Sequence, residues 1–204
     1  MTTNAAPHNA PHHTPASHSN PAAQAMLPAL PALRDVRDAD HELLLSLYRF
    51  THVAMHDVLA NISIDAAQTL LQLQVRAQAA GYRQRFPESI FQVICAPDGQ
   101  VAGRLTTART ATYLHLLDIG LFPAYCGQGW GTYFITSLQC EAGAANIPLH
   151  LAVARSNRAL NLYRRLGFTI TTQHDLDLGM TWFPPDKSRS PHLSINLHKE
   201  VPNA

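Results

Sequence analysis

The stretch DIGLFPAYCGQGWGT, residues 118–132, decides the fold of this chain. An apolar, strand-like segment stops at Pro123, and a glycine at every second position, Gly127, Gly129 and Gly131, leads into a segment with helical periodicity. A helix that begins in this way presents unpaired backbone N–H groups, and glycines allow a ligand to approach the main chain closely. The stretch therefore predicts an anion site, while a purely structural turn that needs positive φ would show the same glycines.

The residues of the turn separate the alternative phosphate-binding folds. A Walker-type loop ends in Gly-Lys-Ser/Thr, whereas this turn continues through Trp130 and Gly131 to Thr132 without a lysine. A dinucleotide-binding fold has its glycines after the first strand and an acid at the end of the second, whereas here the turn comes late and Glu141 lies in the expected helix. The remaining interpretation is a pyrophosphate held by a strand, turn and helix in the middle of a mixed sheet.

A second segment, NRALNLYRRLGF at residues 157–168, connects this interpretation with a known protein family. Residues 118–131 and 157–168 together resemble the two signatures of the GCN5-related N-acetyltransferase (GNAT) superfamily, and the resemblance covers residues 30–183. One position departs from the family pattern, because Cys126 stands where Arg or Gln is usual. A thiol offers little to a phosphate oxygen, so the pyrophosphate is expected to depend on backbone N–H groups, or on Arg164 or Arg165.

The resemblance implies an α/β fold, with α and β elements mixed around one central sheet. That sheet is expected to be mostly antiparallel and flanked by helices, with a splay between its fourth and fifth strands, here 114–121 and 149–154. Residues 30–184 are expected to form one N-acetyltransferase domain. An Ala/Pro/His-rich segment, 1–29, is expected to be a disordered tail, and residues 185–204 a polar C-terminal tail.

Local patterns predict the other elements. Asp38 or Asp40 can cap a helix with one apolar face, formed by Leu43, Leu44, Leu47 and Tyr48. A second helix is expected from residue 65 to about 80, with Gly81 as its C-terminal cap and an apolar face of Ala66, Leu70, Leu73 and Ala77. Residues 97–100 have the composition of a hairpin turn. The expected strands are 30–34, 90–95, 101–107, 112–122, 149–154, 168–172 and 178–183, and further helices are expected up to about residue 145 and over 158–166.

Composition restricts the partners and the location. Fifteen Lys and Arg residues balance fourteen Asp and Glu residues, which gives no indication of nucleic acid or of an anionic membrane. No apolar run is long enough for a membrane span, no export signal is visible, and the three cysteines have no disulfide or zinc spacing. We therefore expect a cytoplasmic protein without a bound metal. The histidines within residues 1–29 leave one alternative, a metal-binding protein that would lose its function when the first 28 residues are deleted.

The resemblance also implies an activity, in which acetyl-CoA donates its acetyl group directly to a primary amine of a small molecule or peptide. The alternative is a non-catalytic acyl-CoA-binding sensor, and either form is compatible with a homodimer. The residues expected to bind the cofactor are Ile119, Leu121, Cys126, Gly127, Gln128, Gly129, Trp130, Gly131, Thr132, Asn157 and Tyr163.

Three side chains are candidates for proton transfer. Tyr163 matches the family tyrosine near the leaving sulfur, where it would act as general acid, although it also suits a core position on its helix. Asp118 and His115 are the candidate general bases, and either could instead be structural. Their opposite parity along a regular strand predicts that only one faces the site. Asn157 equally suits a helix cap, and the cluster formed by Arg76, Arg83 and Arg85 is interpreted as a solvated helix end rather than a site for an acidic acceptor.

Overall fold

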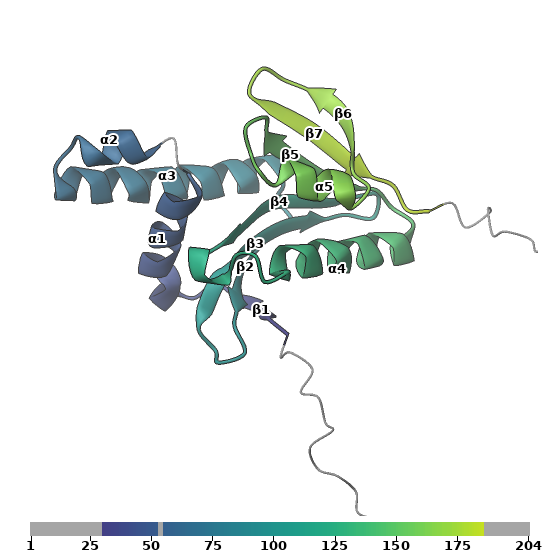
Figure 1. Cartoon of the computed structure of the whole chain (residues 1–204), viewed down its shortest axis with the longest axis horizontal. Coiled ribbons are helices and arrows are strands. Elements are labelled where there is room, and N and C mark those ends of the chain that lie inside the picture. Colours follow the sequence, from purple (N-terminus) through teal and green to yellow (C-terminus); the bar gives the residue numbers. More distant parts are fainter. Residues whose placement is uncertain (1–29, 53–54, 186–204) are drawn as a thin grey trace, which may run out of the picture.

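The computed structural model describes residues 30–52 and 55–185, so the two expected tails lie outside the described residues (Figure 1). Its centre is a seven-stranded sheet in the order β1-β2-β3-β4-β5-β7-β6. Every neighbouring pair is antiparallel except β4 and β5. The strands are β1 Ala32–Asp35, β2 Ser89–Cys95, β3 Val101–Arg109, β4 Leu114–Leu121, β5 Leu149–Ala154, β6 Thr169–Gln173 and β7 Asp177–Trp182. The predicted mixed fold, with a mostly antiparallel sheet flanked by helices, is confirmed.

The helices fall into two groups. They are α1 His41–Thr51, α2 His56–Ala60, α3 Ile64–Arg85, α4 Trp130–Ala145 and α5 Leu160–Arg165, with short 3-10 turns at Asp38–Asp40 and Pro123–Tyr125. The main core joins α4 and α5 to the sheet, through side chains such as Phe134, Leu138 and Leu116. A smaller apolar cluster joins α1 to α2 and α3. Figure 1 shows α2 and the first turns of α3 extending beyond the sheet.

The parallel pair β4 and β5 separates after a short contact. Only residues 114–116 of β4 pair with residues 149–151 of β5. Beyond Leu116 and Leu151 the two strands diverge, which leaves one edge of β4 without a neighbouring strand over residues 117–121. The predicted splay is therefore present.

A β-bulge in β4 lies where the splay begins. Thr107 of β3 pairs with Leu116 and Thr106 pairs with Asp118, so Leu117 is an extra residue. The Tyr82 hydroxyl of α3 donates a hydrogen bond to the Leu117 carbonyl oxygen over 3.0 Å.

The bulge reverses the expected parity of the candidate bases. His115 pairs with Ala108 and Asp118 pairs with Thr106, and the two partners are two residues apart on β3. His115 and Asp118 therefore lie on the same face of the sheet, the face that α1 and α3 approach. The prediction that only one of them faces this side was wrong, because an inserted residue restores equal parity.

Most predicted elements are confirmed, including the hairpin of β2 and β3, the strand β5 and the Gly167 end of α5, where φ is +85°. The helices before β2 differ more. α3 starts after its cap Ser63, whose hydroxyl accepts from the Ala66 N–H over 3.3 Å, and continues through Gly81 to Arg85. Between α1 and α3, residues 56–60 form the short helix α2, which the sequence patterns did not predict.

The faces of α1 and α3 also differ from the prediction. Leu43 is 43% exposed whereas Leu45 is buried, and in α3 Leu73 is 58% exposed whereas Leu71 is buried. α1 carries three consecutive leucines, residues 43–45, so periodicity alone does not define which of them packs. In α3, Leu71 is the one buried residue.

Candidate active site

The residues predicted to bind the cofactor gather around one cavity. All of them except Gln128 line a cavity of about 450 Å³, which we call the loop cavity. It is bounded by the edge of β4, the turn before α4, and α5 with the segment before it. Three lining residues were not predicted, namely Ile135, Ala159 and Leu162, and a further one, Arg165, was considered as a possible pyrophosphate contact.

The glycine-rich turn has the conformation that its sequence predicts. Gly127 and Gly129 have φ of +77° and +83°, values that favour glycine. Gly129 is the N-cap of α4, and the Tyr133 N–H donates to its carbonyl oxygen over 2.9 Å. The N–H groups of residues 130–132 precede this first helical bond, so they and the positive end of the helix dipole are available to an anion.

One side chain of the turn, that of Gln128, is placed differently from the prediction. The Gln128 amide donates to the Ala124 carbonyl oxygen over 2.8 Å, which holds the turn instead of lining the cavity. The Cys126 sulfur lies 3.5 Å from the Phe122 carbonyl oxygen and also lines the cavity. Of the two arginines considered as substitutes for the usual family residue, Arg165 lines the cavity.

Asn157 serves as a cap and also lines the loop cavity. Its side-chain oxygen accepts from the Ala159 N–H over 2.9 Å, directly before α5. Its carboxamide therefore has a fixed orientation, and the side-chain NH₂ group makes no hydrogen bond to another described residue. The two expected roles of Asn157, as a helix cap and as a cofactor contact, are therefore compatible.

The free edge of β4 presents main-chain groups to the splay. The Phe122 N–H donates to the Ala102 carbonyl oxygen of β3 over 2.9 Å. Since hydrogen-bonding direction alternates along a strand, Gly120 also faces β3, whereas the main-chain groups of Ile119 and Leu121 face the splay. These are the two β4 residues that the sequence predicted as cofactor contacts.

Tyr163 combines a core position with access to the loop cavity. It is 7% exposed, and its ring packs edge-on against Phe168 with the centroids 5.8 Å apart. Burial, with a contribution from the charge of Asp118, raises the pKa of the Tyr163 phenol to about 12. A phenol with this pKa stays protonated at neutral pH, as a proton donor requires.

Asp118 is held in an ion pair rather than free. Its carboxylate contacts the guanidinium of Arg104 on β3, which is 7% exposed. The Arg104 guanidinium carbon also lies 5.6 Å from the centroid of the Tyr48 ring of α1. This arrangement ties β3 to β4 under α1, which corresponds to the structural alternative considered for Asp118.

His115 lies among aromatic rings on the same face. Its ring centroid is 4.8 Å from that of Phe86 and 5.9 Å from that of His150. Burial, with the nearby His150 and the positive charge of Arg85, lowers the pKa of His115 to about 4. The imidazole is therefore neutral at pH 7, but it is too weak a base to take a proton efficiently from an alkylammonium.

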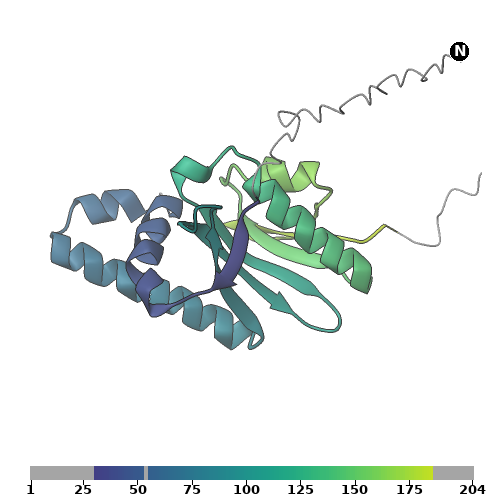
Figure 2. The same ribbon diagram turned by 90° about the horizontal axis from the view of Figure 1, so that it is seen from below.

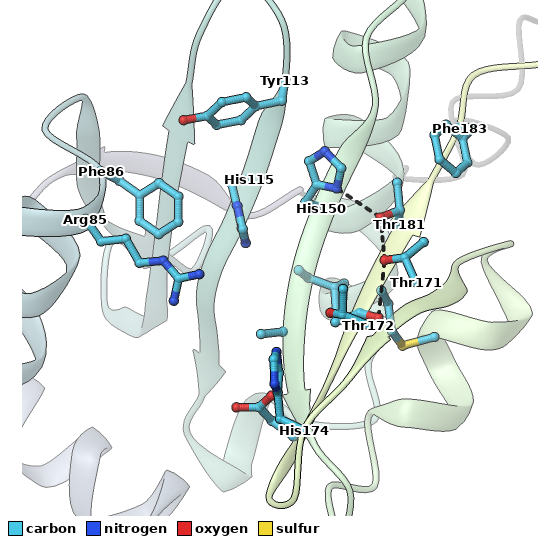
Figure 3. Close-up of a pocket in the computed structure, with 15 residues that line it drawn as sticks. Arg85, Phe86, Tyr113, His115, His150, Thr171, Thr172, His174, Thr181 and Phe183 are labelled. Atoms are coloured by element: carbon cyan, nitrogen blue, oxygen red, sulfur yellow. Dashed lines mark hydrogen bonds between the residues drawn. The ribbon is translucent and has the colours of Figure 1, made fainter.

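Two further cavities on the α3 side of the sheet include His115 in their walls. The first, of about 380 Å³, is the splay cavity, and its wall includes Leu117 and Ala152, the first residues after the paired part of β4 and β5. The second, of about 660 Å³, is the histidine groove, which includes His115, His150 and His174 (Figure 3). The residues common to both are Arg85, Phe86, His115 and Ala152.

Sequence reasoning missed Tyr82, Phe86 and His150 as parts of this region, and it interpreted Arg85 as part of a solvated helix end. The strands of His115 and His150 were both predicted, but their parallel register, which places these two residues opposite each other, was not. Within residues 30–52 and 55–185, no group of three or more His, Cys, Asp or Glu side chains is arranged to hold a metal ion. None of the helices in this described part is long and apolar enough to cross a membrane.

A glycine-rich turn at a helix N-terminus, placed beside a splayed pair of parallel strands, defines an acyl-CoA N-acyltransferase fold. Residues 58–188 match the family model of the acetyltransferase (GNAT) domain, and the chain belongs to this family. No curated protein sequence matches the chain at a significant level.

Solved structures share the fold at low sequence identity. The PaiA N-acetyltransferase of Thermoplasma acidophilum, in complex with coenzyme A, is 16% identical with a TM-score of 0.54, over 76% of this chain and 99% of that one. PH1933 of Pyrococcus horikoshii is 12% identical with a TM-score of 0.56, over 76% and 99% of the two chains. Ard1 of Thermoplasma volcanium is 17% identical with a TM-score of 0.51, over 78% and 100%.

Proposed function

We propose that the protein is an acetyl-CoA-dependent N-acetyltransferase that moves an acetyl group directly to a primary amine of a small molecule or peptide. The observation that carries this proposal is the loop cavity, in which two separate family signatures meet beside the free edge of β4. The Thermoplasma acidophilum protein of the same fold holds coenzyme A. Family membership and the loop cavity together support acyl transfer from coenzyme A.

The loop cavity has groups suited to each part of the donor. The N–H groups of residues 130–132 and the guanidinium of Arg165 would hold the pyrophosphate. The Asn157 amide and the main chain of Ile119 and Leu121 would bind the amides of the pantetheine arm, as an added strand would. Bound acetyl-CoA would supply an activated thioester.

Tyr163 would protonate the departing thiolate sulfur. Its pKa of about 12 keeps the proton on the phenol oxygen until a strongly basic group develops nearby. A backbone N–H at the β4 edge, from Ile119 or Leu121, would stabilise the oxyanion of the tetrahedral intermediate.

Removal of the proton from the amine is a separate demand. An alkylamine with a pKa of about 10.4 is neutral in only about one molecule in 2,500 at pH 7, a cost of about 4.6 kcal/mol, whereas an α-amine near 8 costs about 1 kcal/mol. Asp118 is engaged by Arg104, and His115 has a pKa of about 4. The enzyme is therefore expected to act on those acceptor molecules whose amine is already neutral in solution.

The test is a thermal-shift screen with CoA, acetyl-CoA and longer acyl-CoAs, followed by an amine panel with thiol detection. We expect stabilisation by CoA esters and release of CoA thiol that depends on the amine. Stabilisation without thiol release across the panel would favour the acyl-CoA sensor, an alternative motivated by Cys126 in the turn. Absence of stabilisation by every CoA ester would refute both.

A further inference from the structure

We call the splay cavity and the adjoining histidine groove, which share four lining residues, the path to the β4–β5 splay. They share walls formed by α3 and β4, and the splay cavity reaches Leu117 and Ala152 at the point where the strands separate. The loop cavity meets the same edge of β4 from the opposite face, through Ile119. An acceptor that approaches from the α3 side would therefore place its amine at the splay and its remaining atoms in the groove.

Charge is scarce along this path. Among the described residues that line the two cavities, Arg85 is the only Lys or Arg, and Asp177 is the only Asp or Glu. Arg85 lines both cavities, whereas Asp177 lines the groove alone. The splay cavity, where the reacting amine would lie, therefore has one formal charge, and this charge is positive.

Arg85 is available to a ligand. It is exposed, and it forms no ion pair with another residue of 30–52 or 55–185. Its guanidinium carbon lies 5.5 Å from the centroid of the Phe86 ring, and its charge contributes to the low pKa of His115. Figure 3 shows the side chain extending from the end of α3 toward the strand that carries His115.

The groove beyond Arg85 has a floor of planar, uncharged rings, the aromatic shelf, formed by Phe86, Tyr113, His115 and His150. Tyr113 lies beside both imidazoles, with its ring centroid 6.5 Å from that of His115 and 6.2 Å from that of His150. The His150 Nδ1 atom is 2.9 Å from the Thr181 hydroxyl oxygen, which fixes the orientation of that ring. Burial lowers the pKa of both imidazoles, so the shelf is neutral at physiological pH.

We propose that this path takes an acceptor whose reacting amine has a carboxylate close beside it, as in an α-amino acid, with the carboxylate on Arg85 and a planar or apolar side chain on the aromatic shelf. This inference rests on the proposed N-acetyltransferase function. A guanidinium binds a carboxylate with charge-assisted hydrogen bonds, often two at once. A polycationic acceptor would be repelled by Arg85. Along the whole path it would find one carboxylate, that of Asp177. Arg85 was expected to be part of a solvated helix end, and its place in both cavity walls changes that interpretation.

The test compares acceptors with and without the carboxylate, and kcat/KM is calculated for the neutral amine, because converting the carboxylate to an amide also lowers the pKa of the α-amine. Phenylalanine and leucine are compared with phenylalaninamide and leucinamide, and spermidine serves as the polycation. Binding to the CoA-loaded protein is measured by calorimetry, and kcat/KM with acetyl-CoA by thiol release. We expect the acids to exceed their amides by about tenfold in affinity and in kcat/KM, the lower range for an exposed charge-assisted contact.

Variants assign the preference to Arg85. Arg85→Gln is expected to remove the preference for the acids and Arg85→Lys to retain part of it, with an unchanged KM for acetyl-CoA. The control is Arg83→Gln, because the Arg83 guanidinium lies 4.5 Å from the centroid of the Phe91 ring and lines neither cavity, so the preference should persist.

The outcomes separate this inference from the proposed function. Selective binding of the acids through Arg85 without thiol release would support the acceptor class and contradict the enzyme. Acetylation of amides or spermidine as efficiently as of the acids would support the enzyme and overturn the acceptor class. Loss of the preference in Arg83→Gln but not in Arg85→Gln, or no binding of the acids, would also overturn it.

Discussion

Two titratable side chains near the splay, Tyr163 and His115, are each held in one protonation state by their surroundings. Burial raises the pKa of Tyr163 to about 12, and burial with neighbouring positive groups lowers the pKa of His115 to about 4. Asp118 is paired with the buried Arg104. Tyr163 and His115 therefore keep their charge between pH 6 and 9, so the chemistry is expected to depend on the protonation of the acceptor.

Replacing Tyr163 with Phe removes the proposed proton donor while keeping the ring that packs against Phe168. We expect kcat to fall by about 10²-fold or more, the usual contribution of a general acid, with little change in the KM for acetyl-CoA. The check is steady-state kinetics together with the thermal shift produced by CoA. An unchanged kcat with bound CoA would show that the phenol is only a core side chain.

The pH dependence of kcat/KM is expected to follow the amine of the acceptor. His115 is already neutral above about pH 5, and Tyr163 remains protonated up to about pH 11. Neither group is therefore expected to cause a rise or fall of kcat/KM between these two pH values. With an alkylamine, kcat/KM should rise about tenfold per pH unit from 7 to 9, whereas with an amine of pKa near 8 it should level off at about that pH. A common limb at one pH for both acceptors would instead reveal an enzyme base.

At the level of elements, residue patterns predicted the hairpin, the glycine turn, α4 and β5 because each combines strong local turn chemistry with an apolar period. The bulge at Leu117 was not predictable, because it depends on pairing with β3 and on the Tyr82 hydroxyl from a distant helix. The continuation of α3 through Gly81 was also not predictable from the sequence. Gly81 is exposed and has an ordinary helical conformation, and α3 continues because residues beyond it, including Tyr82, pack on the sheet.

The Arg104–Asp118 pair should stabilise the contact between β3 and β4. Asp118→Asn leaves the guanidinium of a 7% exposed residue without its counter-charge, so we expect a loss of about 3 kcal/mol in the free energy of unfolding, the lower end for a buried pair. Urea denaturation measures this loss. Combining Asp118→Asn with Arg104→Met should recover part of the stability, since the unpaired charge is then removed. A stable but inactive Asp118→Asn protein would argue for a base.

Of the glycines before and at the start of α4, Gly129 is expected to tolerate replacement by alanine less well than Gly131. Gly129→Ala places a Cβ atom at a φ of +83°, and we expect a loss of about 1–2 kcal/mol in the free energy of unfolding. Gly131→Ala is the control, because it lies inside α4 and its Cβ would be 3.8 Å from the Leu162 side chain, an ordinary contact. That variant should be neutral or more stable by up to about 1 kcal/mol. Equal losses in chemical denaturation would contradict a conformational origin.

On the scale of the whole molecule, the fold consists of two groups of elements that meet at the splay. Helices α1 to α3 lie to one side of the sheet and α4 to the other (Figure 2). Between the two halves of the sheet, β4 and β5 are paired only over residues 114–116 and 149–151. This arrangement leaves the loop cavity and the two cavities on the α3 side facing the same strand edge, so donor and acceptor can meet from opposite faces.

The predicted domain limits, residues 30–184, can be tested with a chain of residues 30–185, which ends at the last described residue. The cores and the three cavities described above are formed by residues within this range. We therefore expect the shortened protein to unfold within about 2 °C of the full chain, less than the effect of 1 kcal/mol on a domain of this size. Stabilisation by CoA and the rate of thiol release should also be unchanged, as measured by thermal shift and by thiol detection.

Loss of function after removal of the histidines in residues 1–28, with restoration by adding back a metal-binding tail, would favour the metal-binding alternative instead. Because the cofactor-binding groups come from the β4 edge, the glycine turn and α5, we expect the 30–185 protein to retain them in full.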